Sequence, residues 1–279
     1  MAIITISRGS MSGGTAFAEC LAARLGYVSL SREVLVHVAE NLGVSEEALR
    51  SKIQQATRVW GDLKADRRLY LVALQSALAD ACVSGDLVYH GNAGHFLLNE
   101  LPNVLRVRLI APLSVRIKAA IEQGKLDYRA ARDYIRYVDQ ERIQWTKFVY
   151  GADWQDPANY DLVINLRDIS IATACVMVTE VVSLPAYATT PEAKNRLQDF
   201  ALACRVKLAL VTNPQSRSLE FGVSADSGYV EVFGKGINGS LLGKSGLTED
   251  DIWSIAKTVG GLKEVVLNPR RVQPLGNAA

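Results

Sequence analysis

The sequence has little cysteine and little histidine, and it lacks a long apolar run. Its four cysteines are far apart along the chain and have apolar neighbours, and no Cys-x-x-Cys pair occurs. With only three histidines in addition, buried thiols in a reducing compartment are expected rather than disulfides or a metal site. No apolar run reaches the ~18 residues of a membrane span, and the start lacks a basic-then-apolar signal. We therefore expect a cytoplasmic protein without a transmembrane segment.

An excess of charge of either sign is also missing. The chain carries 31 Lys and Arg against 29 Asp and Glu, a formal net charge of +2. This balance argues against a protein that binds nucleic acid over a large surface, but it is compatible with a small phosphate ligand. The 279 residues, 49% of them hydrophobic, are enough for two domains with a sizeable core.

The start of the chain predicts a phosphate-binding loop. An apolar run, Ile3–Ile6, leads into a turn of small residues, and a helical pattern opens at Thr15. Backbone N–H groups of such a loop and the helix N-terminus attract an anion. The full P-loop pattern is G-x-x-x-x-G-K-[ST]. Gly13 and Thr15 fit it, but Arg8 takes the position of the first Gly and Gly14 that of the Lys, so the cradle is predicted without its usual cation.

Strands alternate with helices up to about residue 182. This order predicts an α/β three-layer sandwich of the P-loop type, with a mostly parallel five-stranded sheet and helices on both faces. Ligands of such sheets bind at the carboxyl ends of the strands. The predicted strands lie near 3–6, 27–29, 87–90, 104–110 and 160–165.

The C-terminal part predicts a small α+β domain with the element order α-β-β-α-β. A helix begins at Pro191 with Thr190 as its N-cap, two strands flank the turn Asp226-Ser227-Gly228, and a capping box at Thr248 opens another helix before a last strand. The predicted divisions are a first domain (1–183), a linker (184–190), a second domain (191–270) and a tail (271–279).

Seven motifs in the first 183 residues carry a family resemblance. They are Ile-Thr-Ile-Ser-Arg (4–8), Ser-Gly-Gly (12–14), Leu-Gly-Tyr (25–27), Ser-Arg-Glu (31–33), Val-Arg-Leu-Ile-Ala-Pro-Leu (107–113), Tyr-Gly-Ala-Asp-Trp (150–154) and Tyr-Asp-Leu-Val-Ile-Asn (160–165). In these the chain resembles the cytidylate kinase-like family, a branch of the P-loop nucleoside monophosphate kinases in which Ser-Gly-Gly without Lys is common. It departs from that family at Gly91-Asn92-Ala93-Gly94, where Gly-Arg-Gly-Ala is usual.

Residues 190–270 resemble a BON domain, a small module associated with phospholipid or ligand contact. The resemblance rests on the element order, on Val-Glu-Val-Phe-Gly (230–234) and on Val-Gly-Gly-Leu-Lys-Glu-Val-Val (259–266). The loop 235–246 is longer than is usual in that family. Within it, Gly243-Lys244-Ser245 has the appearance of a P-loop ending, but position 238 is Asn and the next helix opens only near Thr248. We interpret it as a flexible loop.

The resemblance implies roles for three groups of residues. The phosphate cradle with ATP and Mg²⁺ would comprise Arg8, Ser10, Ser12, Gly13, Gly14 and Thr15, with Thr15 as the metal ligand. The lid would supply the catalytic cations Arg132, Arg136 and Arg142, because Arg suits bidentate phosphate binding. The acceptor monophosphate would contact Arg32, Asn92 and His95. The alternatives are a solvated helix whose arginines pair with Asp133, Asp139 and Glu141, a surface cap for Arg32, and a satisfied buried histidine for His95.

These features predict transfer of the ATP γ-phosphoryl group to CMP or a similar monophosphate. One alternative is a catalytically degenerate nucleotide-binding sensor that signals through its C-terminal domain. Another is a scaffold that binds no nucleotide. The acceptor base and the oligomeric state stay open, with a homo-oligomer among the alternatives, as does phospholipid contact through the second domain.

Overall fold

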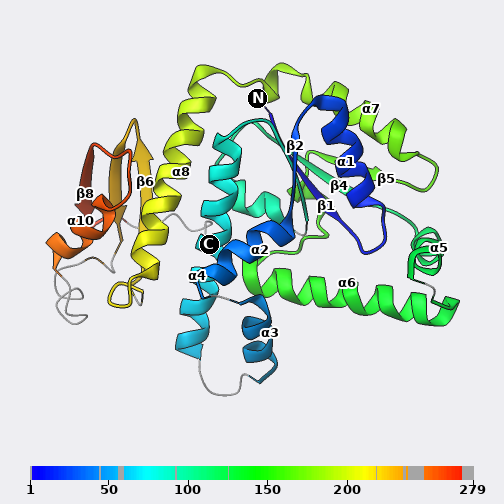
Figure 1. The fold of residues 1–279 in the computed structure, drawn as a ribbon, viewed down its shortest axis with the longest axis horizontal. Helices are drawn as coiled ribbons and strands as arrows, with labels where there is room; N and C mark the ends of the chain where they lie inside the picture. Colours follow the sequence, from blue (N-terminus) through cyan, green and yellow to red (C-terminus); the bar gives the residue numbers. More distant parts are fainter. Residues whose placement is uncertain are drawn as a thin grey trace. The chain divides into compact units, whose positions relative to one another are not determined.

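The computed structural model describes residues 2–43, 45–55, 60–91, 93–124, 126–217, 219–234, 237 and 248–271. The chain divides into two compact units, each of which joins two separate stretches of sequence. Unit 1 comprises Met1–Val34 and Ser84–Thr190, and unit 2 comprises Leu35–Val83 and Pro191–Ala279. Figure 1 shows the elements of both units along the chain.

Unit 1 is built on a five-stranded sheet. Its strands are β1 (Ile3–Arg8), β2 (Val28–Ser31), β3 (Leu87–Gly91), β4 (Val104–Ile110) and β5 (Leu162–Asn165). Their order is β2-β3-β1-β4-β5, and all four pairings are parallel. The predicted α/β sandwich with a mostly parallel sheet is therefore confirmed. Because β1 is central, both of its faces are buried, including the face that carries Thr5 and Ser7.

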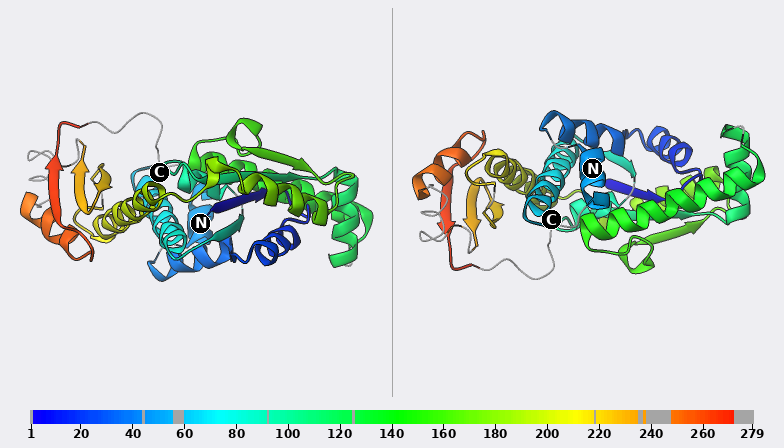
Figure 2. Two further views of the ribbon diagram at one scale, coloured as in Figure 1. Left: turned by 90° about the horizontal axis from the view of Figure 1, so that it is seen from above. Right: turned by 90° about the horizontal axis from the view of Figure 1, so that it is seen from below.

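Helices cover the sheet and set the position of the loop after β1. α1 (Gly14–Leu25) and α7 (Ile171–Val182) pack on one face, where Ile4 and Ile6 meet Phe17 and Val178 in one apolar core. In Figures 1 and 2, α6 (Tyr128–Tyr150) runs on the side of the sheet away from α7. The remaining elements of unit 1 are α5 (Leu113–Gly124), η1 (Gly94–Leu98), η2 (Pro157–Asn159) and η3 (Pro185–Tyr187).

Unit 2 packs helices beside a small mixed sheet. Its elements are α3 (Glu46–Gln55), α4 (Trp60–Val83), α8 (Pro191–Thr212), β6 (Gly222–Asp226), β7 (Tyr229–Phe233), α10 (Glu249–Lys257) and β8 (Glu264–Asn268), while α2 (Arg32–Asn41) crosses from unit 1 into unit 2. β7 pairs antiparallel with β6 and parallel with β8. Figure 2 shows α8 and α10 beside this sheet. The predicted second α+β fold is present, and Thr248 caps α10 in the predicted capping box.

The compact units differ from the predicted domains over residues 35–83. α4 packs along α8, where the small residues Ala79, Ala201 and Cys204 form a buried cluster that lets the two helices approach closely. The change from unit 1 to unit 2 at Thr190 falls at the end of the predicted linker. The domain boundaries drawn from the sequence stay a prediction.

Some element boundaries also differ from expectation. α4 begins at Trp60, whereas the sequence predicts a break at 58–61 and a helix from about 65. The sequence predicts strands from Leu219 and from Leu262, whereas β6 begins three residues later and β8 two residues later. The segment Gly243-Lys244-Ser245 lies outside the described residues. Among the described helices, no single one is long and apolar enough to cross a membrane, although Ile171–Val182 and Pro185–Thr212 would meet the criteria of length and composition as a bent pair.

Candidate phosphate-binding site

The loop between β1 and α1 has the shape of an anion cradle. Gly13 is the N-cap of α1 and has a left-handed φ of 79°, a conformation that glycine adopts without strain. Because glycine has no side chain with which to cap the helix, the first N–H groups of α1 receive no side-chain hydrogen bond there. The hydroxyl of Ser12 donates to the Gly9 carbonyl at 2.9 Å and closes the loop. Backbone N–H groups at this helix N-terminus are therefore available for an anion.

The two departures from the P-loop pattern lie against each other. A Cβ atom placed on Gly14 would be 1.9 Å from Cδ of Arg8 and 2.8 Å from its Cβ. The side chain of Arg8 therefore occupies the space through which a side chain at position 14 would leave the helix. Its Nε is buried without a hydrogen-bond partner in the part of the chain that the structure describes. Arg8 thus brings a cation to the cradle where the pattern expects a lysine.

An ion pair from the following helices holds the loop. Nε of Arg116, in the first turn of α5, donates to the Ser10 carbonyl at 2.6 Å. Its Nη2 donates to both carboxylate oxygens of Asp139, on α6, at 2.8 and 2.6 Å. Asp139 in turn accepts a hydrogen bond from the Ser10 N–H at 3.3 Å. Because the side chains of Arg116 and Asp139 are only 12% and 23% exposed, this pair fixes Ser10 from both sides of its backbone.

Arg142 approaches the same loop from α6. Its Nη1 donates to the Arg8 carbonyl at 3.1 Å. Burial lowers the pKa of Arg142, and the nearby positive charges of Arg8, Arg32 and Arg116 lower it further, against the opposite effect of Asp139. The carboxylate of Glu33 also lies in the field of Arg8 and Arg32. Among the described residues, the guanidinium groups of Arg8, Arg32, Arg116 and Arg142 thus lie near one another with the carboxylates of Asp139 and Glu33. Such a cluster of cations favours an anionic ligand.

The predicted catalytic arginines separate into one that reaches the loop and two that do not. Arg142 contacts the backbone of Arg8, and it lies on the inward side of α6 with the buried Ile135. Arg132 pairs instead with its neighbour Asp133 at 3.0 Å, which matches the alternative of a solvated charged helix. Arg136 is exposed. Their i, i+4 spacing places Arg132 and Arg136 side by side on α6, but Arg132 is partly exposed and Arg136 is exposed, and among the described residues no hydrogen bond or ion pair joins either of them to the loop.

The predicted acceptor residues lie around the end of β3. Arg32 begins α2, and a Cβ on Gly91 would be 2.6 Å from the Cβ of Arg32, so glycine at position 91 allows this close approach. His95 is 2% exposed, and its ring lies 4.6 Å from that of Tyr160. Burial, with smaller effects of two arginines on β4, lowers the pKa of His95 to about 3. The histidine is therefore neutral at physiological pH. Asn92 lies outside the described residues.

Arg116, which holds the loop, and the buried Arg108 were missed in the sequence. Arg116 is the fourth residue after Pro112, so its place in the first turn of a helix that follows a strand was the available signal. Arg108 is on β4 and is 8% exposed. Its guanidinium lies 4.8 Å from the Trp154 ring and 5.6 Å from the Tyr160 ring, and it donates to the Trp154 carbonyl at 3.0 Å. No signal in the sequence indicated that Arg108 is buried against Trp154 and Tyr160, because the alternation of a strand alone would place an arginine on a polar face.

The residues present could hold a nucleotide-bound magnesium ion only in part. Among the described residues, no three His, Cys, Asp or Glu side chains lie close enough to hold a metal ion by themselves. Thr15, the second residue of α1, is exposed beside the cradle and offers a hydroxyl oxygen. Magnesium takes few protein ligands and completes its shell with water and phosphate oxygens. A single hydroxyl at this place is therefore compatible with an ion that arrives with its nucleotide.

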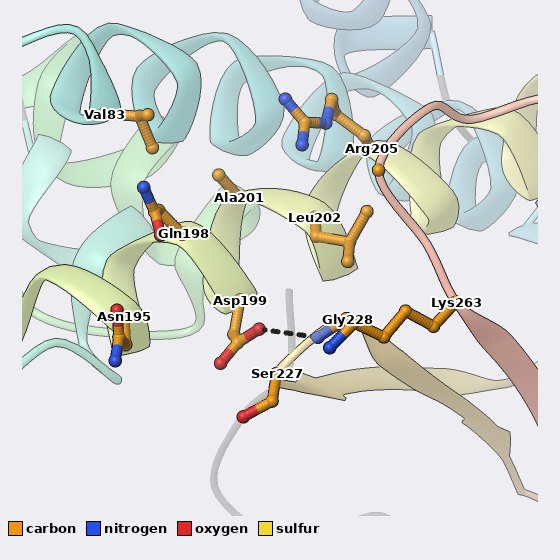
Figure 3. Close-up of a pocket in the computed structure, with 11 residues that line it drawn as sticks. Val83, Asn195, Gln198, Asp199, Ala201, Leu202, Arg205, Ser227, Gly228 and Lys263 are labelled. Atoms are coloured by element: carbon orange, nitrogen blue, oxygen red, sulfur yellow. Dashed lines mark hydrogen bonds between the residues drawn. The ribbon is translucent and has the colours of Figure 1, made fainter. Parts of the chain in front are cut away.

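Unit 2 contains a separate polar pocket of about 490 Å³ (Figure 3). One wall is the face of α8 that carries Asp199, Leu202 and Arg205, and the opposite wall is the β6–β7 turn with Lys263. The carboxylate of Asp199 accepts a hydrogen bond from the Gly228 N–H at 3.3 Å, drawn as the dashed line. The pocket thus offers cations, a carboxylate and an apolar floor to a polar ligand.

Comparisons with known proteins show the family of the first part of the chain. The model of the cytidylate kinase-like family matches residues 3–168, which is more than half of the chain. A cytidylate kinase of Staphylothermus marinus is 28% identical over 175 residues, 61% of this chain and 90% of that protein. A cytidylate kinase of Methanopyrus kandleri is 27% identical over 172 residues, 58% of this chain and 83% of that protein.

Among solved structures, an uncharacterized protein of Eubacterium ventriosum shares the fold. Its TM-score is 0.53 at 19% identity, and the match covers 65% of this chain and 98% of that one. None of these matches is to a BON domain, so the resemblance of residues 190–270 to that family stays a prediction. On the evidence of the loop, the parallel sheet and the match over residues 3–168, the chain belongs to the cytidylate kinase-like family.

Proposed function

We propose that this protein transfers the γ-phosphoryl group of ATP to a pyrimidine nucleoside monophosphate such as CMP. The observation that carries the proposal is the convergence of Arg8, Arg116 and Arg142 on the β1–α1 loop, whose helix N-terminus has no side-chain cap. Phosphoryl transfer depends mainly on positioning and on neutralising the charge of the transferred group. A glycine cradle inside an excess of arginine supplies both.

Each element of the site has a role in this proposal. The loop Ser10–Gly14 binds the nucleotide phosphates through its backbone N–H groups, and Arg8 supplies the cation that the missing lysine would provide. Arg116 and Asp139 hold the loop in shape rather than contact the substrate. Arg142 neutralises charge from the side of α6, and Arg132 and Arg136 are lid residues that would act only after closure. Thr15 would hold Mg²⁺, which screens phosphate charge when it is bound with ATP.

The acceptor would bind at the end of β3. Arg32 is the proposed contact of the monophosphate, with Asn92 beside it and His95 as the buried, neutral support of the turn. The relatives are named cytidylate kinases, which supports a pyrimidine acceptor. The finer choice of CMP rests on these relatives alone.

The direct test measures ADP formation from ATP and Mg²⁺ with each common nucleoside monophosphate. We expect turnover with CMP or another pyrimidine monophosphate, and we expect Arg142→Met to lower kcat/KM by about 100-fold or more, since it removes a charge-assisted contact of about 1.5–3 kcal/mol and a neutralising charge. Arg129→Met on the exposed side of the same helix is the matched control and should leave the rate within about twofold. Equal losses in both variants would contradict the role of Arg142.

A second experiment tests Arg8 as the substitute cation. Arg8→Gly should weaken Mg²⁺-ATP binding by about 10- to 150-fold, the value of one charge-assisted hydrogen bond. The double variant Arg8→Gly with Gly14→Lys regenerates the complete pattern Gly-x-x-x-x-Gly-Lys-Thr at positions 8–15. It should recover most of the lost affinity, as measured by titration calorimetry. If Arg8→Gly binds Mg²⁺-ATP as well as the parent, the cation comes from elsewhere.

A specific observation also supports the second candidate, a catalytically degenerate nucleotide sensor. The loop has no lysine, and unit 2 has a polar pocket of its own that the phosphotransfer reaction does not require. In this alternative the C-terminal BON-like module would pass on the signal, by contact with a phospholipid or another ligand. Tight Mg²⁺-dependent ATP binding without turnover on any acceptor would favour the sensor. Absence of ATP binding would exclude both candidates and leave the scaffold.

A further inference from the structure

Two cysteines that are far apart in the sequence meet inside unit 1. Cys20 is on α1 and Cys175 is on α7, 155 positions apart along the chain. Their sulfur atoms are 2.8 Å apart, and the Cys175 thiol points its hydrogen at the Cys20 sulfur. A disulfide bond has an S–S distance of about 2.05 Å, so the two sulfurs need to approach by only about 0.75 Å.

The surroundings give the two thiols different properties. Cys20 is partly exposed, whereas Cys175 is 1% exposed and also lies 3.7 Å from the Phe17 carbonyl. Burial, and then the neighbouring Cys20 sulfur, raise the pKa of the Cys175 thiol to about 12, while Arg24 on α1 acts in the opposite direction. An oxidant in solution therefore reaches Cys20 first, and Cys175 stays protonated behind it.

We propose that Cys20 and Cys175 form a site of reversible oxidation, in which a peroxide converts the touching thiols into a disulfide that links α1 to α7. In the first step the Cys20 sulfur attacks a peroxide oxygen; the O–O bond breaks, Cys20 becomes a sulfenic acid and water or an alcohol leaves. In the second step the Cys175 sulfur attacks the Cys20 sulfur. The S–O bond breaks, and the hydroxyl leaves as water with the proton of Cys175. A thiol reductant restores both cysteines by disulfide exchange.

The link would act on the helix that carries the phosphate loop. α1 begins directly after Gly13, and a Cβ on Gly13 would already be 3.3 Å from the side chain of Ile171, the first residue of α7. The disulfide would link the two helices further along, seven residues after Gly13 and four residues after Ile171. It therefore restrains α1 without occupying the loop, and the inference does not depend on which ligand the loop binds.

The experiment treats the full-length protein with a few equivalents of hydrogen peroxide and then alkylates the remaining thiols in denaturant. We expect a species lighter by two hydrogen atoms that retains two alkylatable thiols. After trypsin digestion, peptides 9–24 and 168–194 should be joined, and the link should disappear with dithiothreitol. The melting temperature of the oxidised protein should rise by about 5–15 °C, since the crosslink closes a long loop in the unfolded chain. A joined pair other than this one, or a lowered melting temperature, would overturn the proposal.

Variants separate the pair from general cysteine oxidation. Cys82→Ala removes a thiol that is equally buried but lies in unit 2, so it should crosslink as the parent does. Cys175→Ala leaves Cys20 without its resolving thiol, and Cys20 should then gain oxygen atoms instead of a link. Cys20→Ala should leave Cys175 unoxidised, and this variant provides the test if Cys175→Ala does not fold. Unchanged thiols in the parent and in Cys175→Ala would show that the oxidant does not reach the pair, and would overturn the proposal.

Discussion

Gly14 offers the sharpest test of how the cradle is built. A methyl group added there should lower the free energy of unfolding when position 8 is Arg and raise it when position 8 is Gly. An alanine in a helix is favoured over glycine by up to about 1 kcal/mol. Gly14 is the first residue of α1 and has no left-handed φ, so its backbone accepts alanine. With Arg8 present, however, the new Cβ would be 1.9 Å from Cδ of Arg8.

The overlap between the new Cβ and Arg8 determines how much Gly14→Ala changes the free energy of unfolding. Overpacking of this kind costs about 1–3 kcal/mol, and because the Cβ of Arg8 is also only 2.8 Å away, rotation of the side chain about its outer bonds does not relieve it. Gly14→Ala should therefore destabilise the parent by about 0.5–2 kcal/mol. In the Arg8→Gly background the same change should stabilise by about 0.5–1 kcal/mol. The interaction free energy of the cycle is then about 1–3 kcal/mol.

Urea unfolding of the parent, both single variants and the double variant measures this cycle. Gly9→Ala is the matched control in the same loop, since its Cβ would meet Arg116 at an ordinary 3.5 Å. It should show no coupling with position 8 beyond about 0.5 kcal/mol. Equal effects of Gly14→Ala in the two backgrounds would refute the account in which Arg8 fills the path of the missing lysine.

Two further outcomes can be checked on the same samples. Asp139→Asn breaks the largely buried pair with Arg116 and should lower the free energy of unfolding by about 2–4 kcal/mol in urea titrations. The control Asp133→Asn breaks the exposed pair with Arg132 and should change this free energy by less than about 0.5 kcal/mol. Similar losses in both variants would refute the role of the Arg116–Asp139 pair in holding the loop. For His95, the folded pKa of about 3 lies below the ordinary 6.5, so the unfolded state binds more protons and stability falls as the pH drops below about 6.5. The loss between pH 8 and pH 4.5 should be about 2–3 kcal/mol larger in the parent than in His95→Gln, and an equal loss would place the titrating group elsewhere.

The fold of unit 1 was largely predictable because its signals are local. The apolar run Ile3–Ile6, the small residues after it and the helical spacing from Thr15 specify strand, loop and helix over a few residues each. Alternation of such elements then implies a parallel sheet. The grouping of residues 35–83 with the C-terminal part was not predictable in this way. It depends on α4 and α8 packing through Ala79 and Ala201, which are more than a hundred residues apart.

For the candidate site too, local features were predictable from the sequence and long-range contacts were not. The sequence by itself determined that a glycine cradle follows β1 and that its lysine is absent, because both are properties of adjacent residues. Only the tertiary structure decided which cations reach the cradle: Arg116 and Arg142 do, whereas Arg136 faces solvent. The physical reason is that helical periodicity determines which residues share a face, whereas packing against the rest of the chain determines where that face points. The contact of Cys20 with Cys175 was invisible in the sequence for the same reason.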